Sequence, residues 1–280
     1  QKYFGRDGRE EAGELLERRS GNADKPRILG AFNEKTPDWL SFFMFTNFTD
    51  RDGKMQLESL AQSGFDPLSR TCRFMLMEEA FHMFVGETGV SRTIEQTCTK
   101  MNEAGIKDPF EVDAVRALGV IDLPTIQRKA NFHMSVTRDL FGAEVSTNAA
   151  NSFNAGIKGR FQEVKIDDDH QLENDTYTVT RFRDGQFVDE EVPALSAINA
   201  RLLDDYIADC QGGINRWNKV IEKAGIDFQI SQPHKAFNRR IGEFADVDVS
   251  PDGKVVDKAA WNDRKDQWLP TEADRAYVQS

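Results

Sequence analysis

Apolar residues recur at helical spacing through the segment 73–88, which reads RFMLMEEAFHMFVGET. A repeat of three and four residues is typical of a helix with one face toward a protein core. The positions on that face are Cys72, Met75, Leu76, Met83 and Gly86. The pattern therefore predicts a long helix packed along this stripe.

Two polar residues interrupt the same stripe. Glu79 falls on it, and His82 follows three residues later, close to one helical turn further along. A carboxylate on an apolar face is costly unless a positive partner accompanies it, and a metal ion is the simplest such partner. Inward-facing Glu-x-x-His pairs build carboxylate-bridged di-iron sites in helical bundles. The motif is short and also occurs in ordinary soluble helices, so spacing alone leaves both interpretations open.

A second apolar helix upstream favours the metal interpretation. We expect it to begin at Pro37, with Thr36 as its N-cap, and to end in Asp50 on its apolar face. Two such helices joined by a modest connection form an antiparallel pair. That pair can place Asp50 opposite Glu79 and His82, which predicts a metal half-site.

The first part of the chain otherwise reads as helices separated by glycine-containing breaks. Asp52–Gly53 predicts a break before a short helix over 54–63. Asp66 and Pro67 predict the start of the long helix, with Asp66 as N-cap, and Gly86 and Gly89 should loosen it before 91–104 continue. Further helices are expected over 9–19, 109–118, 125–149 and 161–172.

The pattern changes after residue 172. Alternation over 176–188 around Asp184–Gly185 predicts a β-hairpin with a two-residue turn. A helix over 193–223, broken near Gly212–Gly213, a small hairpin over 247–256 and a helix over 259–267 should follow. We therefore expect an all-α protein with minor β structure, divided into a helical core at 1–172 and a helical extension at 173–280.

Charge and composition narrow the function classes. The net charge of −11 argues against a nucleic-acid-binding surface. No apolar run approaches a membrane span and no leader for export is evident, so a cytoplasmic protein is expected. Cys72, Cys98 and Cys210 are odd in number and widely separated, and therefore predict neither a disulfide framework nor a cysteine metal site. The chain opens without Met and stops inside a helical pattern, which favours a piece of a larger protein.

Other polar clusters offer competing interpretations. Asp139 with Asp167 and His170 repeats the pattern of a lone acid followed by an acid and a histidine three residues apart. The run of acids at 167–169 favours a charged helix end instead. His133 and His234 are interpreted as hydrogen-bonded structural histidines.

A basic cluster near the end of the chain leaves two readings open. Lys235, Arg239 and Arg240 could meet an anionic ligand such as a CoA phosphate. They could equally form a solvated face, which we favour.

Several long segments resemble one known family, the oxygenase component of benzoyl-CoA epoxidase. They are FNEKTPDWLSFFMFT at 32–46, TDRDGK at 49–54, FMLMEEAFH at 74–82, FVGETG at 84–89, IDLPT at 121–125, EVSTNAA at 144–150, LSAINARL at 195–202 and WLPTE at 268–272. The resemblance covers essentially the whole chain. It implies a ferritin-like di-iron carboxylate bundle that uses O₂ to epoxidise the ring of benzoyl-CoA in aerobic benzoate breakdown.

The resemblance also assigns residues and partners. Asp50, Glu79 and His82 match iron ligands of the family, while the remaining ligands, a Glu and a second Glu-x-x-His, are expected upstream of Gln1. Electrons should come from a separate flavin and iron–sulfur reductase that uses NADPH. The chain alone is then expected to hold half of the site, to be inactive, and to leave an apolar surface open.

Two other functions remain open at this point. A related di-iron oxygenase could act on another aryl-CoA thioester. A ferritin-like protein could instead bind iron without catalysis.

Overall fold

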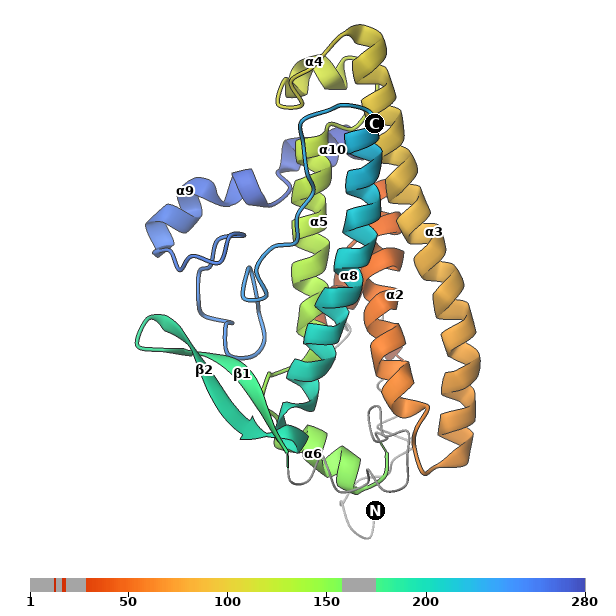
Figure 1. Cartoon of the computed structure of the whole chain (residues 1–280), viewed down its shortest axis with the longest axis vertical. Helices are drawn as coiled ribbons and strands as arrows, with labels where there is room; N and C mark the ends of the chain where they lie inside the picture. Colours follow the sequence, from red (N-terminus) through yellow and green to blue (C-terminus); the bar gives the residue numbers. More distant parts are fainter. Residues whose placement is uncertain (1–12, 14–16, 19–28, 158–174, 280) are drawn as a thin grey trace.

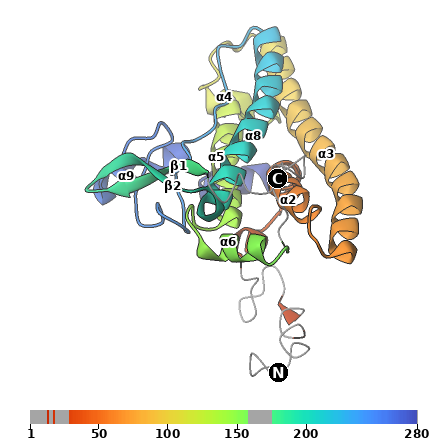
Figure 2. The ribbon, with the colours of Figure 1, turned by 60° about the horizontal axis from the view of Figure 1, so that its bottom comes forward.

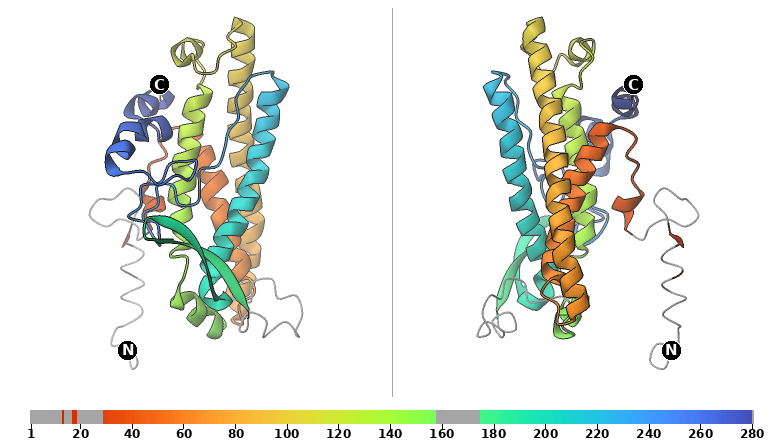
Figure 3. Two further views of the ribbon diagram at one scale, coloured as in Figure 1. Left: turned by 60° about the vertical axis from the view of Figure 1, so that its left-hand side comes forward. Right: turned by 90° about the vertical axis from the view of Figure 1, so that its right-hand side faces the viewer.

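The computed structural model describes residues 13, 17–18, 29–157 and 175–279. Four helices, α2, α3, α5 and α8, run roughly along the long axis of the molecule (Figures 1 and 3). The α-helices of the described ranges are α2 (Trp39–Leu60), α3 (Asp66–Ala104), α4 (Val112–Arg116), α5 (Leu123–Arg138), α6 (Thr147–Asn154), α8 (Ile198–Lys223), α9 (Lys258–Trp268) and α10 (Glu272–Gln279). Short 3-10 turns are η1 (Gly30–Asn33), η2 (Asp139–Phe141) and η4 (Ala194–Ala197).

Helix α2 begins at Trp39, two residues later than expected. The carboxylate of Asp38, and not Thr36, caps it by accepting a hydrogen bond from the backbone N–H of Ser41 at 2.7 Å. The predicted break at Asp52–Gly53 is wrong, because α2 continues unbroken to Leu60. Gly53 instead lies against α3, where a Cβ would come within 3.3 Å of Oε1 of Glu79.

Helix α3 is also continuous where a loosening was expected. Gly86 and Gly89 allow α3 to lie directly on α2. A Cβ at Gly86 would stand 2.5 Å from the backbone N of Asn47, and one at Gly89 would stand 2.3 Å from the ring of Phe43. These glycines therefore serve close helix packing and do not break the helix.

The expected start of α3 is one residue off. Phe65 is the N-cap, and Asp66 is the first helical residue, with the following proline in the first turn. The helix ends at Ala104, and the following Gly105 has a left-handed φ of 74°.

The expected helix over 125–149 is shorter and split. Asp122 caps α5 through the backbone N–H of Thr125, and the helix ends at Arg138. Gly142 then adopts a φ of 81°, which an L side chain rarely adopts, and turns the chain toward α6.

The first β-hairpin is confirmed. Strands β1 (Thr176–Arg183) and β2 (Gln186–Pro193) pair antiparallel with Phe182 opposite Phe187. Asp184 and Gly185 form the turn with φ values of 50° and 81°. The hairpin and α9 lie on the side of α5 and α8 away from α3 (Figure 2).

Two expectations for the second half are wrong. The second hairpin reduces to one isolated bridge between Val249 and Val255. Helix α8 begins at Ile198 and runs unbroken through Gly212 and Gly213. The missing side chain at Gly213 leaves room for Glu87, because a Cβ there would lie 3.2 Å from Oε2 of Glu87.

The main core lies where α8 meets α2, α3 and α5. Side chains of α8 that face it and are fully buried are Leu202, Tyr206, Ile214, Trp217 and Ile221. The all-α class with a β-hairpin is confirmed, and the arrangement is consistent with a partial ferritin-like bundle. Helix α8 belongs to this core. The division of the chain into two parts at residue 172 stays a prediction.

The first half of α3 is only partly buried. Of the predicted stripe, Cys72 and Gly86 are buried, but Met75 is exposed. Large apolar side chains also point outward from this half of the helix: Phe74, Met77, Phe81 and Phe84. We call these four residues the apolar face of α3, and they agree with the expectation of an open apolar surface. Within the described residues, no helix is both long and apolar enough to span a bilayer.

Candidate metal centre

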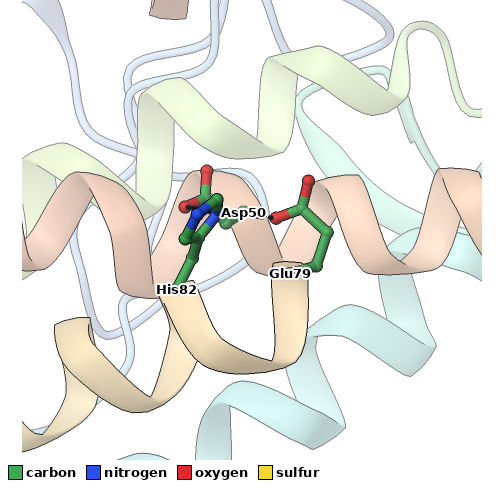
Figure 4. A group of neighbouring side chains, drawn as sticks. All are labelled: Asp50, Glu79 and His82. Carbon is green, nitrogen blue, oxygen red and sulfur yellow. Dashed lines mark ion pairs between the residues drawn. The ribbon is translucent and has the colours of Figure 1, made fainter. Parts of the chain in front are cut away.

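Three side chains meet where α2 lies against α3. Asp50 comes from α2, and Glu79 and His82 come from α3, with their polar ends toward one another (Figure 4). Nδ1 of His82 lies 3.5 Å from Oδ2 of Asp50 and 3.7 Å from Oε2 of Glu79. One potential ligand atom from each residue lies within 4.8 Å of the other two. The structure therefore brings together all three residues that the sequence singled out.

Local helix geometry produces this meeting. Glu79 and His82 are three residues apart on α3 and so share a face. Gly86, one turn further, draws α3 onto the backbone of α2. Gly53, three residues beyond Asp50, leaves the space that the carboxylate of Glu79 occupies. The site thus depends on two glycines as well as on the three polar groups.

The two carboxyl groups are electrostatically strained in the absence of a cation. Burial, followed by the nearby charge of Glu79, raises the pKa of Asp50 to about 7, and His82 opposes this rise. Burial also raises the pKa of Glu79, again against the effect of His82. Both shifts mean that this environment disfavours two negative charges.

One buried oxygen of the site has no hydrogen bond, and Nδ1 of His82 lies 3.7 Å from it. Oε2 of Glu79 is buried and accepts no hydrogen bond. A buried carboxylate oxygen without a donor is costly, and a bound cation would satisfy it. Carboxylate oxygens and an imidazole nitrogen are suitable ligands for Fe(II) and Fe(III), and other divalent transition metals share this preference. The residues present therefore fit a metal ion.

Asp139 is the one residue of the competing acid–histidine pattern that the structure describes, and it is paired elsewhere. Asp139 accepts a hydrogen bond from Nε of Arg239 at 2.7 Å and another from the backbone N–H of Arg240 at 3.1 Å. Asp167 and His170 lie outside the described residues. In the part of the chain that the structure describes, Asp50, Glu79 and His82 are the sole group of three with metal-binding geometry.

The expectation of a solvated basic face is wrong for its central residue. Arg239 is buried between two acids, with Nη1 3.2 Å from Oε1 of Glu144 in addition to its bond to Asp139. Lys235 lies 3.5 Å from Asp204, and the guanidinium of Arg240 lies 3.6 Å from Glu34. Each of these cations has an acidic partner, which sequence spacing could not reveal because the acids are distant in the chain.

Among the described residues, His133 and His234 lie apart from the candidate centre. His133 is buried, and burial lowers its pKa to about 3, so the ring is neutral. Nδ1 of His234 accepts a hydrogen bond from the backbone N–H of Ala236 at 3.2 Å. The three cysteines are free and buried, as expected for Cys72.

Sequence reasoning missed a cavity next to the site. It has a volume of about 550 Å³ and begins at Phe84 and Val85, one turn beyond His82. It continues along α3 to Thr97 and is lined also by Phe43 of α2 and by residues 119–121. No local pattern signals it, because its walls come from three separate segments.

No protein-family model matches the sequence. Benzoyl-CoA oxygenase component B of Aromatoleum evansii is 60% identical to the chain over 278 residues, which is 99% of the chain. The chain spans 58% of the length of that relative.

Proposed function

We propose that this chain, a homologue of benzoyl-CoA oxygenase component B over almost its whole length, carries one half of a di-iron oxygenase centre. The proposed reaction is epoxidation of the aromatic ring of benzoyl-CoA with O₂. The identity of 60% to this relative is the reason to propose this reaction rather than that of another class of iron protein.

The observation that carries the proposal is the buried oxygen of Glu79 that accepts no hydrogen bond, in a group with Asp50 and His82. Asp50, Glu79 and His82 would hold the metal. A bound iron centre would supply the reduction of O₂ next to the substrate ring. The chain's own contribution is to hold two carboxylates and an imidazole on rigid helices, so that the ligands are in place before iron binds.

Three protein ligands are too few to complete the coordination of either iron in a pair. We propose that the remaining ligands, a Glu and a second Glu-x-x-His, come from sequence upstream of Gln1. The relative is long enough for such a segment, since the chain spans 58% of it. The apolar face of α3 is the surface on which helices of that segment would pack, which agrees with its exposure.

The partners follow from the same proposal. The substrate would be benzoyl-CoA, and the electrons would come from a separate NADPH-dependent reductase with flavin and iron–sulfur centres. The relative's designation as component B indicates a system of several proteins.

A chimera tests the function directly. The 278 aligned residues of this chain replace their counterparts in the longer relative, and O₂ and NADPH consumption are measured with reductase and benzoyl-CoA. The chimera should turn over benzoyl-CoA, and the same chimera with His82→Ala should not. The isolated chain should be inactive.

Two results would redirect the proposal. Faster turnover of phenylacetyl-CoA than of benzoyl-CoA would indicate another aryl-CoA as substrate. Iron bound at the site without reductase-dependent O₂ consumption would indicate a non-catalytic iron-binding protein.

A further inference from the structure

A buried arginine lies directly behind the candidate metal centre. Arg51 follows Asp50 on α2, and consecutive helical residues point about 100° apart. Asp50 therefore faces Glu79 and His82 while Arg51 faces another part of the bundle. The side chain of Arg51 is 5% exposed, so its charge depends on partners within the protein.

The guanidinium of Arg51 joins three helices. Within α2, its Nη2 donates to the side-chain oxygen of Asn47 at 3.1 Å. The same Nη2 lies 3.4 Å from Oε2 of Glu87 on α3, and Nη1 lies 2.9 Å from Oδ2 of Asp209 on α8. A planar group with several fixed donors suits this task, whereas an ammonium cannot reproduce the geometry.

Glu87 extends the connection from α3 to α8. It lies five residues beyond His82 on the same helix. Its carboxylate binds Arg216, with Nη2 at 2.7 Å, and its backbone oxygen accepts a hydrogen bond from Nε1 of Trp217 at 3.1 Å. Helix α3 is thus fixed to α8 just beyond its two candidate ligands.

The α2–α3 contact at this level leaves no free space. Asn47, which binds Arg51, is also the residue whose backbone N would lie 2.5 Å from a Cβ at Gly86. Helix α3 can approach α2 here only in the register that the glycine allows. The polar network and the close packing therefore fix the same pair of helices.

We propose that Arg51 is a positioning residue for the metal centre: by joining α2, α3 and α8, it sets the register that keeps Asp50 opposite Glu79 and His82. This inference rests on the proposed function of the three ligands. Residues that orient the ligands of a metal typically change its affinity about 10- to 100-fold when they are altered.

Arg51 can be substituted without leaving its acidic partners unpaired. Without the guanidinium of Arg51, Asp209 keeps Lys54 at 3.2 Å and Glu87 keeps Arg216. Neither acid is left as an isolated buried charge. The substitution Arg51→Lys therefore removes the connection between helices while retaining the positive charge.

A matched control lies at the other end of the molecule. Arg116 on α4 joins Asp122 at 2.8 Å and Asp274 at 2.6 Å. Helix α4 lies near the C-terminal end of α3 (Figure 1). That end lies 22 residues beyond His82, or about 33 Å along the helix. Arg116→Lys should weaken the fold without reaching the metal centre.

The experiment titrates Co²⁺ into the full chain and its variants and records the visible absorption bands of bound Co²⁺. Arg51→Lys should weaken Co²⁺ binding by about tenfold or more and alter the bands, whereas Arg116→Lys should leave both within twofold of the parent. Equal binding by Arg51→Lys and the parent, or equal weakening by both variants, would overturn the inference. If Arg51→Lys does not fold, Asp209→Asn, which removes one arm of the network, takes its place.

A second readout separates this inference from the metal proposal. Spin labels at Phe42→Cys on α2 and Phe84→Cys on α3 report the distance between the helices by pulsed EPR, and the native cysteines are buried. Arg51→Lys should broaden or shift this distance and Arg116→Lys should not. If the parent binds no Co²⁺, the metal proposal fails, and the EPR distances alone decide whether Arg51 sets the register.

Discussion

At the scale of single residues, the carboxyl group of Asp50 opposes folding when no metal is bound. Its pKa is about 7 in the folded chain and about 3.9 in an unfolded one. The folded state therefore binds more protons between these values, and stability falls as the pH rises from about 4 to about 7. Above pH 7 the full penalty applies.

Asp50→Asn should remove that penalty. At pH 8 with a chelator present, the variant should be more stable than the parent by about 1–3 kcal/mol, a range reduced for partial exposure of the group. The gain should be smaller at pH 5, where the folded carboxyl is already largely protonated. Urea unfolding at both pH values measures it, and a variant that is less stable at pH 8 would contradict the expected strain.

Gly53 offers a test in which stability and metal binding move in opposite directions. Gly53→Ala should stabilise α2 by about 0.5–1 kcal/mol, because alanine loses less conformational freedom in a helix. Its new Cβ would stand 3.3 Å from Oε1 of Glu79, so metal affinity should fall by about 3- to 10-fold as the carboxylate moves. Thermal unfolding and Co²⁺ titration provide the two measurements.

Gly212→Ala on α8 is the matched control. A Cβ there meets nothing closer than Nη1 of Arg216 at 3.7 Å. This variant should gain the same stability without loss of metal affinity. Weakened binding in both variants would show that Gly53 has no particular role.

At the scale of whole helices, the contact between α2 and α3 depends on the absence of side chains at two positions. Gly86→Ala should destabilise the chain by about 1–3 kcal/mol despite its better helix propensity, because its Cβ would overlap the backbone of α2. Urea unfolding measures the loss, with Gly212→Ala again as the control. A stabilised Gly86→Ala variant would mean that α2 and α3 do not pack this closely.

These helices also show how far sequence reasoning extends. The apolar repeats placed α2 and α3, and the Asp–Gly turn placed the hairpin, because each signal is local. Glycine was misread at Gly53, Gly86 and Gly213, since a helix break and a close helix contact demand the same residue. Which of the two applies depends on a partner helix that the local pattern does not contain.

The candidate site also contains residues that the local sequence identifies and residues that it does not. Asp50, Glu79 and His82 could be identified because their spacing within two apolar segments is a local feature of the sequence. Arg51 could not, because its partners Glu87 and Asp209 are 36 and 158 residues away. The burial of Arg239 escaped notice for the same reason.

At the scale of the whole molecule, the apolar face of α3 exposes four large apolar side chains to water. Phe74, Met77, Phe81 and Phe84 are each more than 60% exposed and follow one stripe of the helix. Such a surface favours association. The chain by itself should therefore self-associate at micromolar concentration.

Sedimentation velocity tests this with paired charges. Met77→Lys combined with Phe84→Lys should reduce self-association while leaving the thermal midpoint nearly unchanged, because both side chains already lie in solvent. Phe110→Lys, which alters an equally exposed ring outside this face, should not reduce it. Undiminished association of the double variant would place the interface elsewhere.

The most direct test of the account is iron binding by the chain itself, followed by X-ray absorption at the iron edge. Anaerobic addition of Fe(II) should give a bound ion with one imidazole nitrogen and carboxylate oxygens in its first shell, and binding should be lost in Asp50→Asn, Glu79→Gln and His82→Ala alike. Iron bound equally well by all three variants, or a first shell without imidazole, would contradict the assignment of this site as a metal centre.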